Sequence, residues 1–317
     1  MNIEKIFSLS AAKLKNALRN ELHMLGYAEG NLHNKKDFLY AEGNAPYMLI
    51  AHLDTVHTKL PSIICYSKDG NYMMSPQGIG GDDRCGVYII LELLNKLPFK
   101  PYVLFTMGEE IGGIGADAFI EYMIGHDIPD LKYIVEYDRK GNKDCVFYQC
   151  DNPEFTEFVE KFGFKKAYGT FSDISIIAPE FGVAAVNLSS GYYSPHTEHE
   201  YVSMKDMGNI IEMSLKMFNA EAEHFEYIEV KHTYSYSNGD IEVSFVPAKT
   251  IYVYSGYSDY TYMNAEFEIA VDRFGNYYRY NRTYGDLISL WSDIAPVEGT
   301  MLPAYDENNS HKLPLYL

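Results

Sequence analysis

Cysteine is scarce in this chain, which holds four in 317 residues: Cys65, Cys85, Cys145 and Cys150. A disulfide scaffold needs a denser, paired set, so that class of small secreted domain is excluded. The spacing of Cys145 and Cys150 fits neither CxxC nor a zinc-knuckle pattern. We therefore expect reduced thiols that pack as small apolar side chains.

Long hydrophobic runs are also missing. No stretch approaches the roughly 18 apolar residues of a membrane span, and the first 25 residues form an amphipathic helical pattern with lysines along it. A signal peptide would instead have a continuous apolar centre. The sequence therefore favours a cytoplasmic protein without a membrane anchor.

Positive charge is in deficit, with 26 Lys and Arg against 44 Asp and Glu and a net charge of −18. Nucleic acids and anionic membranes attract cationic surfaces, so both are disfavoured as partners. Bound divalent cations would offset part of the acidity. With 47% hydrophobic residues, the chain has enough apolar material for a core.

Apolar runs alternate with helical patterns through the first two-thirds of the chain. The strand-like runs are Tyr47–His52, Tyr102–Met107, Lys132–Tyr137 and Val183–Leu188. The helical patterns between and after them are Arg84–Leu97, Ala116–Met123, Glu154–Phe162 and Met204–Phe218. This alternation predicts an α/β fold, three-layer α/β/α with a mostly parallel mixed central sheet, over residues 1–220.

The sequence changes character near residue 221. Short alternating runs rich in Tyr, Val, Ile and Phe follow: Ile241–Val246, Thr250–Tyr254, Tyr260–Ile269 and Asn276–Tyr280. Alternation with intervening turn signals predicts antiparallel strands, so residues 221–317 are expected to form a β-rich extension. Its role is open between a dimerisation element, which would make a homo-oligomer, and a wall of the substrate cleft.

Five separated clusters of acidic and histidine residues lie between positions 52 and 200. They read His52-Leu53-Asp54, Gly80-Gly81-Asp82-Asp83-Arg84-Cys85-Gly86, Gly108-Glu109-Glu110-Ile111-Gly112-Gly113, Glu136-Tyr137-Asp138-Arg139 and Pro195-His196-Thr197-Glu198-His199-Glu200. Most follow a predicted strand. Ligands gather at the carboxyl ends of parallel strands, so we expect these side chains to meet.

A pair of divalent cations about 3.5–4 Å apart needs a bridging carboxylate, further carboxylate and imidazole ligands, and a separate base. His52 is a candidate ligand with Asp54 beside it, and Asp82 is the natural bridge because it opens a helix between glycines. Glu109 and Glu110 should point to opposite sides, which makes one a ligand and the other a base.

Asp138 and His196 would complete the two ligand sets. Three neighbours compete for these roles: Asp83 with Asp82, Glu136 with Asp138, and His199 with His196. Thr170, Ser172 and Asp173 form either a substrate-facing loop or an ordinary helix cap.

These segments resemble the co-catalytic zinc exopeptidases, a superfamily that includes bacterial and deblocking aminopeptidases, peptidase T, glutamate carboxypeptidase and the aminoacylases. The similarity lies in His-x-Asp after a strand, Asp-Asp-Arg-x-Gly opening a helix, Thr-Met-Gly-Glu-Glu, and a final histidine in His-x-x-His-Glu-Tyr, over roughly residues 45–215. The stretch between Asp138 and His196 is too short for an inserted lid domain, which needs about 50 residues of its own. The chain thus resembles the lidless branch.

The resemblance implies a role for each candidate. His52 and Asp138 would bind one metal ion, Glu110 and His196 the other, and Asp82 both. Glu109 would be the proton shuttle, and Asp54 would orient His52. Zinc is the expected metal, with cobalt or manganese as alternatives.

The expected activity is hydrolysis of an amide bond of a peptide, with an aminopeptidase favoured by the missing lid. The alternative is a carboxypeptidase or N-acyl amino acid deacylase in which Arg139, Lys140 or Arg84 grips a carboxylate. A third reading is a metal-binding protein without turnover.

Overall fold

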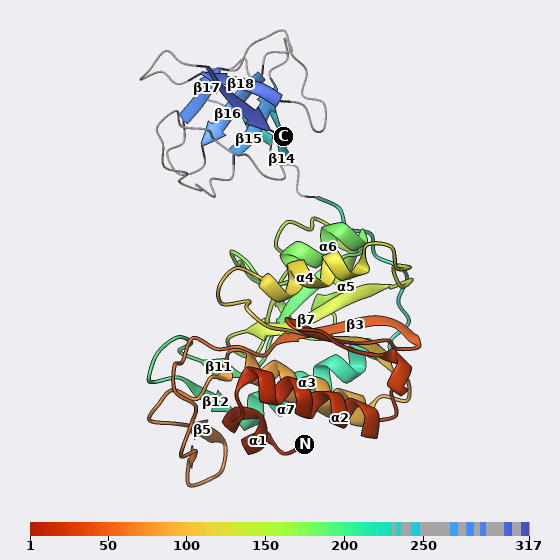
Figure 1. Cartoon of the computed structure of the whole chain (residues 1–317), viewed down its shortest axis with the longest axis vertical. Coiled ribbons are helices and arrows are strands. Elements are labelled where there is room, and N and C mark those ends of the chain that lie inside the picture. The colour runs from red at the N-terminus through yellow and green to blue at the C-terminus, as the bar shows by residue number, and fades with distance from the viewer. Residues whose placement is uncertain are drawn as a thin grey trace. The chain divides into compact units, whose positions relative to one another are not determined.

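The computed structural model describes residues 1–229 continuously and, beyond them, only the strands at 233–235, 242–247, 267–271, 277–281, 286–289, 301–305 and 312–316 (Figure 1). The chain divides into two compact units, Met1–Glu229 and Val230–Leu317.

The first unit extends past the predicted boundary at residue 220. After the last helix the chain returns along the sheet, where the amide of Phe225 donates to the carbonyl of Lys132 at 2.9 Å and that of Tyr227 to Gly182 at 3.0 Å. Phe225 is buried. The sequence placed the boundary too early because this short return segment has no helical or alternating pattern.

An eight-stranded mixed sheet forms the centre of the first unit, in the order β1-β2-β6-β3-β7-β10-β8-β9. The strands are β1 (Leu32–Asn34), β2 (Phe38–Ala41), β3 (Ala45–His52), β6 (Pro101–Thr106), β7 (Tyr133–Arg139), β8 (Asp144–Val146), β9 (Lys165–Lys166) and β10 (Ala185–Ser189). The central four, β6, β3, β7 and β10, are mutually parallel. The predicted three-layer arrangement is confirmed.

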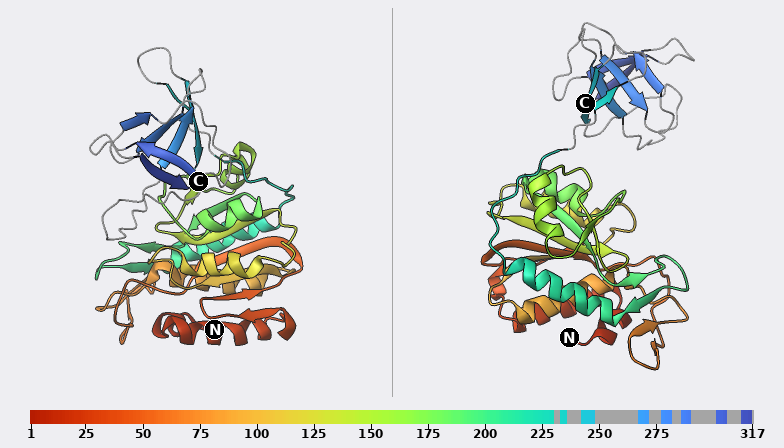
Figure 2. Two further views of the ribbon diagram at one scale, coloured as in Figure 1. Left: turned by 45° about the horizontal axis from the view of Figure 1, so that its top comes forward. Right: turned by 180° about the vertical axis from the view of Figure 1, so that it is seen from behind.

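Helices cover both faces of this sheet (Figures 1 and 2). The helices α4 (Ile114–Met123) and α6 (Ile174–Phe181) lie on one face and pack together over Met48, Ile50 and Leu104. The opposite face is covered by α1 (Ile3–Ser8), α2 (Ala11–Met24), α3 (Gly81–Lys96), α5 (Pro153–Glu160) and α7 (Met204–Phe218).

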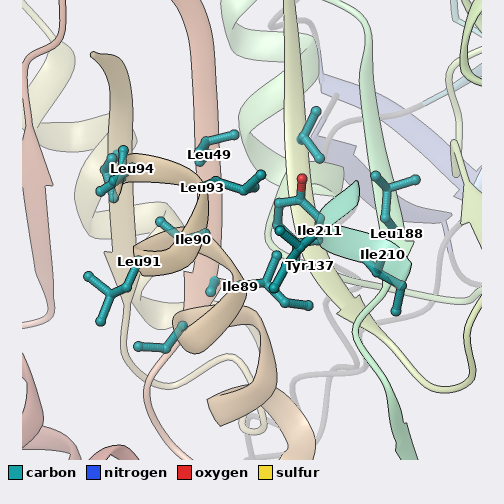
Figure 3. Close-up of a cluster of buried hydrophobic side chains, with 14 of the residues drawn as sticks. Leu49, Ile89, Ile90, Leu91, Leu93, Leu94, Tyr137, Leu188, Ile210 and Ile211 are labelled. Carbon is teal, nitrogen blue, oxygen red and sulfur yellow. The ribbon is translucent and has the colours of Figure 1, made fainter. Parts of the chain in front are cut away.

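The larger core lies between α3, α7 and the sheet. Figure 3 shows Leu93 of α3 beside Leu49 of β3, and Ile210 and Ile211 of α7 near Tyr137 and Leu188. All six are nearly or completely buried. The apolar stripe along each helix therefore faces the strands, as the sequence periodicity predicts.

Two helices differ from the sequence prediction. The amino-terminal helix is broken into α1 and α2, because Leu9 and Ser10 are extended and Ser10 stands at the N-cap of α2. The helix α6 was not predicted as a helix, because Pro179 lies inside it and its residues are almost uniformly apolar. In residues 1–229 and the later strands, no helix has the length and apolarity that crossing a membrane requires.

A smaller antiparallel sheet lies beside the main one, in the order β11-β12-β5-β4. Its strands are β4 (Cys65–Tyr66), β5 (Tyr72–Met74), β11 (Tyr192–Tyr193) and β12 (Tyr201–Ser203). The loop between β11 and β12 carries His196. This sheet therefore connects the start of α7 to one of the candidate ligands.

The described strands of the second unit pair antiparallel, as predicted. They are β13 (Thr233–Ser235), β14 (Glu242–Pro247), β15 (Phe267–Val271), β16 (Tyr277–Asn281), β17 (Asp286–Ser289), β18 (Met301–Tyr305) and β19 (Lys312–Tyr316). The runs predicted at 241–246 and 276–280 overlap β14 and β16. The run at 250–254 lies outside the described residues, as does most of the run at 260–269.

Candidate metal centre

The candidate ligands meet at the carboxyl ends of the central parallel strands. His52 is the last residue of β3 and is in register with Thr106, the last residue of β6. Asp138 lies near the end of β7, on the other side of β3. Asp82 comes from the first turn of α3, and His196 from the loop after β11.

Asp82 places its two carboxylate oxygens against different histidines. Oδ1 is 3.1 Å from Nε2 of His52, and Oδ2 is 3.2 Å from Nε2 of His196. Asp82 has a non-helical backbone conformation, and its peptide bond to Asp83 is cis. A carboxylate that offers one oxygen to each of two imidazoles has the arrangement of a bridging ligand.

The other candidates form two groups around this carboxylate. Oδ1 of Asp138 is 3.4 Å from Nε2 of His52, and Oε2 of Glu110 is 3.2 Å from Nε2 of His196. We call the set His52, Asp82 and Asp138 the His52 position, and the set His196, Asp82 and Glu110 the His196 position. The structure thus brings together all five residues that the sequence offered as metal ligands.

Glu109 lies close to the His52 position but farther from the imidazole than the ligand candidates do. Its Oε2 is 4.0 Å from Nε2 of His52. Ligand atoms of His52, Glu109 and Asp138 all lie within 4.8 Å of one another, as do those of His52, Asp82 and Glu110. Glu109 thus belongs to one group and Glu110 to the other, although both groups share His52. The strand β6 ends at Thr106 and both glutamates lie in the turn after it, so the predicted strand alternation does not extend to them.

Asp54 holds the turn that carries this glutamate pair. Its carboxylate accepts hydrogen bonds from the backbone amides of Gly108 at 2.7 Å, Glu109 at 3.4 Å and Glu110 at 3.3 Å. Its Oδ1 is 3.5 Å from Nδ1 of His52, which is a long polar contact. Burial raises the pKa of Asp54, but His52 and the Gly108 amide outweigh burial and lower it to about 2. The sequence predicted the contact with His52 and missed the three amides.

The site holds more buried negative charge than its own cationic groups neutralise. Burial, reinforced by neighbouring carboxylates, raises the pKa of Glu109 to about 8 and that of Asp138 to about 7. Oε1 of Glu110 is buried without a hydrogen-bond partner. Divalent cations would let these groups ionise together, and mixed imidazole and carboxylate donors suit zinc, cobalt or manganese. The residues present fit two such cations.

Asn187 fixes the backbone of Asp138 from the neighbouring strand β10. Its Oδ1 accepts from the amide of Asp138 at 2.8 Å, and its Nδ2 lies 3.3 Å from the carbonyl of Asp138 and donates to Oγ of Ser172 at 3.0 Å. No pattern in the sequence points to Asn187. Only the parallel pairing of β7 with β10 brings it to the site.

The competing candidates have other contacts. Asp83 is buried and accepts from the amide of Gly86 at 3.0 Å, so it caps the start of α3. Glu136 lies two residues before Asp138 in β7. Its side chain is buried and accepts a hydrogen bond from Ser172. His199 is exposed, and only its backbone amide makes a hydrogen bond that the structure records, to Oγ1 of Thr197 at 3.2 Å.

The structure also decides between alternatives that the sequence left open at two places. Ser172 and Asp173 are completely buried, so they face the interior rather than a substrate, and Asp173 occupies the N-cap of α6. Arg84 is also buried and donates to the carbonyls of Leu53, Ile6 and Leu9. It anchors α1 to the loop after β3, which removes it as a candidate for gripping a substrate carboxylate.

Comparisons with known proteins place the fold. No family model matches the sequence, and no curated protein matches it. Among solved structures, aminopeptidase PepT from Bacillus cereus is 14% identical with a TM-score of 0.56, covering 68% of this chain and 96% of that one. A tripeptidase from Staphylococcus aureus is 15% identical with a TM-score of 0.54, covering 68% and 95%.

A third solved structure, aminopeptidase APDkam598 from the archaeon Desulfurococcus kamchatkensis, is 16% identical with a TM-score of 0.53 and covers 69% of this chain and 94% of that one. At such low identity these matches establish the shared fold. They agree with the resemblance to the co-catalytic exopeptidases that the sequence motifs indicate.

Proposed function

We propose that this protein is an aminopeptidase that hydrolyses the amide bond at the amino end of a peptide with two bound divalent cations, zinc first among them. One observation carries the proposal: Asp82 faces His52 and His196 with separate oxygens, and each histidine has a further carboxylate beside it. The aminopeptidases and the tripeptidase with the same fold support a peptide substrate.

In this proposal His52 and Asp138 would hold one cation, His196 and Glu110 would hold the other, and Asp82 would contribute to both. When bound, the cations lower the pKa of a water molecule toward about 7 and polarise the scissile carbonyl. Asn187 and Asp54 lie outside the proposed ligand set. They fix the backbone of Asp138 and of the glutamate turn, so that the donors are already in place.

Glu109 is the general base and acid. Its carboxylate takes a proton from the water as the water oxygen forms a bond to the carbonyl carbon. It then gives that proton to the amine nitrogen as the C–N bond breaks, so that the carboxylate is restored. Burial raises the pKa of Glu109 in the metal-free protein. Bound cations would favour its ionised form, which is the form that a general base needs to accept a proton.

The neighbouring glutamates allow a matched test. Glu109→Gln should keep both metal ions and lose activity by about 100- to 10,000-fold, the usual contribution of a general base. Glu110→Gln makes the same chemical change one residue away and should instead reduce the metal content. Metal per chain is read by elemental analysis and turnover with an aminoacyl anilide. Full activity in Glu109→Gln would exclude this mechanism.

The choice between aminopeptidase and the alternative depends on the substrate. An aminopeptidase should cleave aminoacyl anilides and leave N-acyl amino acids intact, whereas a carboxypeptidase or deacylase should do the reverse. Among the three cationic candidates for binding a carboxylate, Arg139 and Lys140 remain, since Arg84 is committed to backbone carbonyls. Activity of the Arg139→Ala variant on both substrates completes the comparison.

A further inference from the structure

Glu200 is a completely buried carboxylate close to the metal centre but outside its ligand set. Its Oε2 accepts a hydrogen bond from the backbone amide of Gly80 at 2.8 Å and lies 2.7 Å from Nε2 of His57. Its Oε1 accepts from the backbone amide of Asp82 at 3.0 Å. Both oxygens are therefore in use, and one of the donors is the amide of the bridging ligand itself.

These contacts join three segments that each carry ligands. His57 lies on the loop that follows His52 and Asp54, Asp82 ends the segment from residue 78, and Glu200 ends the loop that contains His196. The segments are far apart in the sequence. A single carboxylate is the point at which they meet.

The backbone fits closely around the side chains of Glu200 and His57. A Cβ added to Gly78, which has a φ of +78°, would lie 2.2 Å from Cε1 of His57. A Cβ on Gly81 would lie 3.2 Å from Oε1 of Glu200. These two glycines, which both precede Asp82, thus let the chain pass close to Glu200 and His57 without a clash.

We propose that Glu200 and His57 are positioning residues that hold Asp82 and the His196 loop in the metal-binding arrangement before metal arrives. The proposal rests on the metal centre of the proposed function. Groups that orient metal ligands typically contribute about 10- to 100-fold to metal affinity. The ligands themselves are unchanged in variants of this pair, so the effect is on geometry and not on the number of donors.

The main test is Glu200→Gln in the full-length chain. Glutamine has one acceptor oxygen and places an NH2 group where a second acceptor is needed, so it opposes one of the two backbone amides. We expect about 10- to 100-fold weaker binding of Zn²⁺ by the metal-free protein, measured by competition with a chelator. The matched control is Glu198→Gln, an identical change on the exposed side of the same loop, which should bind as the unchanged protein does.

A second readout separates positioning from general stability. The cobalt-loaded protein has visible absorption bands that report ligand geometry, and Glu200→Gln at saturating Co²⁺ should shift them. The proposal is overturned if the spectrum is unshifted and the loss of metal affinity is matched by an equal loss of thermal stability in EDTA. That result would show that Glu200 has a merely structural role.

His57 supplies an independent pair of variants if Glu200→Gln fails to fold. His57→Gln keeps an N–H donor near the place of Nε2 and should retain most Zn²⁺ affinity, whereas His57→Ala removes the donor and should weaken binding. Equal affinity in the two variants would overturn the proposal. If the unchanged protein binds two equivalents of Zn²⁺ and every variant binds Zn²⁺ equally well, the positioning proposal is overturned. The proposed function then stays intact. No Zn²⁺ binding in the unchanged protein would reject both.

Discussion

At the scale of single residues, the metal centre is a place where ionisation and folding oppose each other. Glu109 and Asp138 keep raised pKa values because burial penalises their charged forms. His196 has a pKa raised to about 9, first by its hydrogen bond with Asp82 and also by Glu110. Without cations, the folded chain therefore holds protons that the unfolded chain would release.

This opposition predicts how the stability of the metal-free protein depends on pH. A carboxyl group whose pKa is raised by folding stabilises the folded state at acid pH. That contribution is lost as the pH rises from the pKa in the unfolded chain, about 4, to the pKa in the folded chain. The folded value is about 7 for Asp138 and about 8 for Glu109. The raised pKa of His196 acts in the same direction, up to about 9. In EDTA the melting temperature should fall from about pH 5 to about pH 8.

Saturating Zn²⁺ should remove most of this decline, because the cation replaces the protons. Asp138→Asn, which cannot ionise, should also show a smaller decline in EDTA. A metal-free protein that becomes more stable toward pH 8 would contradict the assignment of these groups.

At the scale of elements, the approach of α3 to β7 determines where Asp82 enters the site. Gly86 allows this approach, because a Cβ at that position would lie 2.2 Å from the carbonyl oxygen of Tyr137 and 2.4 Å from Oδ2 of Asp83. The helix would have to move away from the strand to accommodate a methyl group. Asp82, one turn earlier, would move with it.

Gly86→Ala should therefore destabilise the fold by about 1–3 kcal/mol, the usual cost of overpacking a core, and weaken Zn²⁺ binding as well. The control is Gly208→Ala in α7, where no atom lies within 4 Å of the added Cβ. That change should be neutral or stabilising by up to about 1 kcal/mol. Chemical denaturation measures both. A Gly86→Ala protein as stable as Gly208→Ala would show that the approach of α3 is not tight.

The elements also show what sequence patterns can and cannot predict. Buried parallel strands and amphipathic helices have strong local signals, so β3, β6, β7, α3 and α7 were predicted within a few residues. The ligand candidates could be named because each is a metal-binding residue type next to such an element. The supporting contacts of Asn187 and Glu200 could not be predicted, because they join segments that only the folded sheet brings together. The break at Ser10 was missed because a cap residue is a weaker signal than the apolar stripe that runs through it.

At the scale of the whole molecule, the first unit contains every residue of the proposed metal centre and a core of its own. The last buried residue of this unit is Phe225. Its ring centroid is 5.0 Å from that of Phe155 and 5.2 Å from that of Phe158. The chain from 220 to 229 is thus part of the unit and not a linker. The homo-oligomer suggested by the sequence stays a prediction.

Two truncations test this division. A chain that ends at Glu229 should melt cooperatively and bind two equivalents of Zn²⁺. A chain that ends at Ala220 loses the buried ring of Phe225 and should be less stable by about 3–5 kcal/mol, the typical cost of removing a core phenylalanine. Equal melting temperatures for the two fragments would show that the return segment does not stabilise the unit.

The two histidines of the centre differ sharply in their contact with solvent: the side chain of His52 is 0% exposed, whereas that of His196 is 54% exposed. In the proposed centre, water and chelators would reach an ion beside His196 directly and would have to displace protein to reach one beside His52. The pair of ions should therefore have unequal lifetimes, with the outer one released first when zinc becomes scarce. If the proposed function holds, the protein would then pass through a form with a single ion before it loses both.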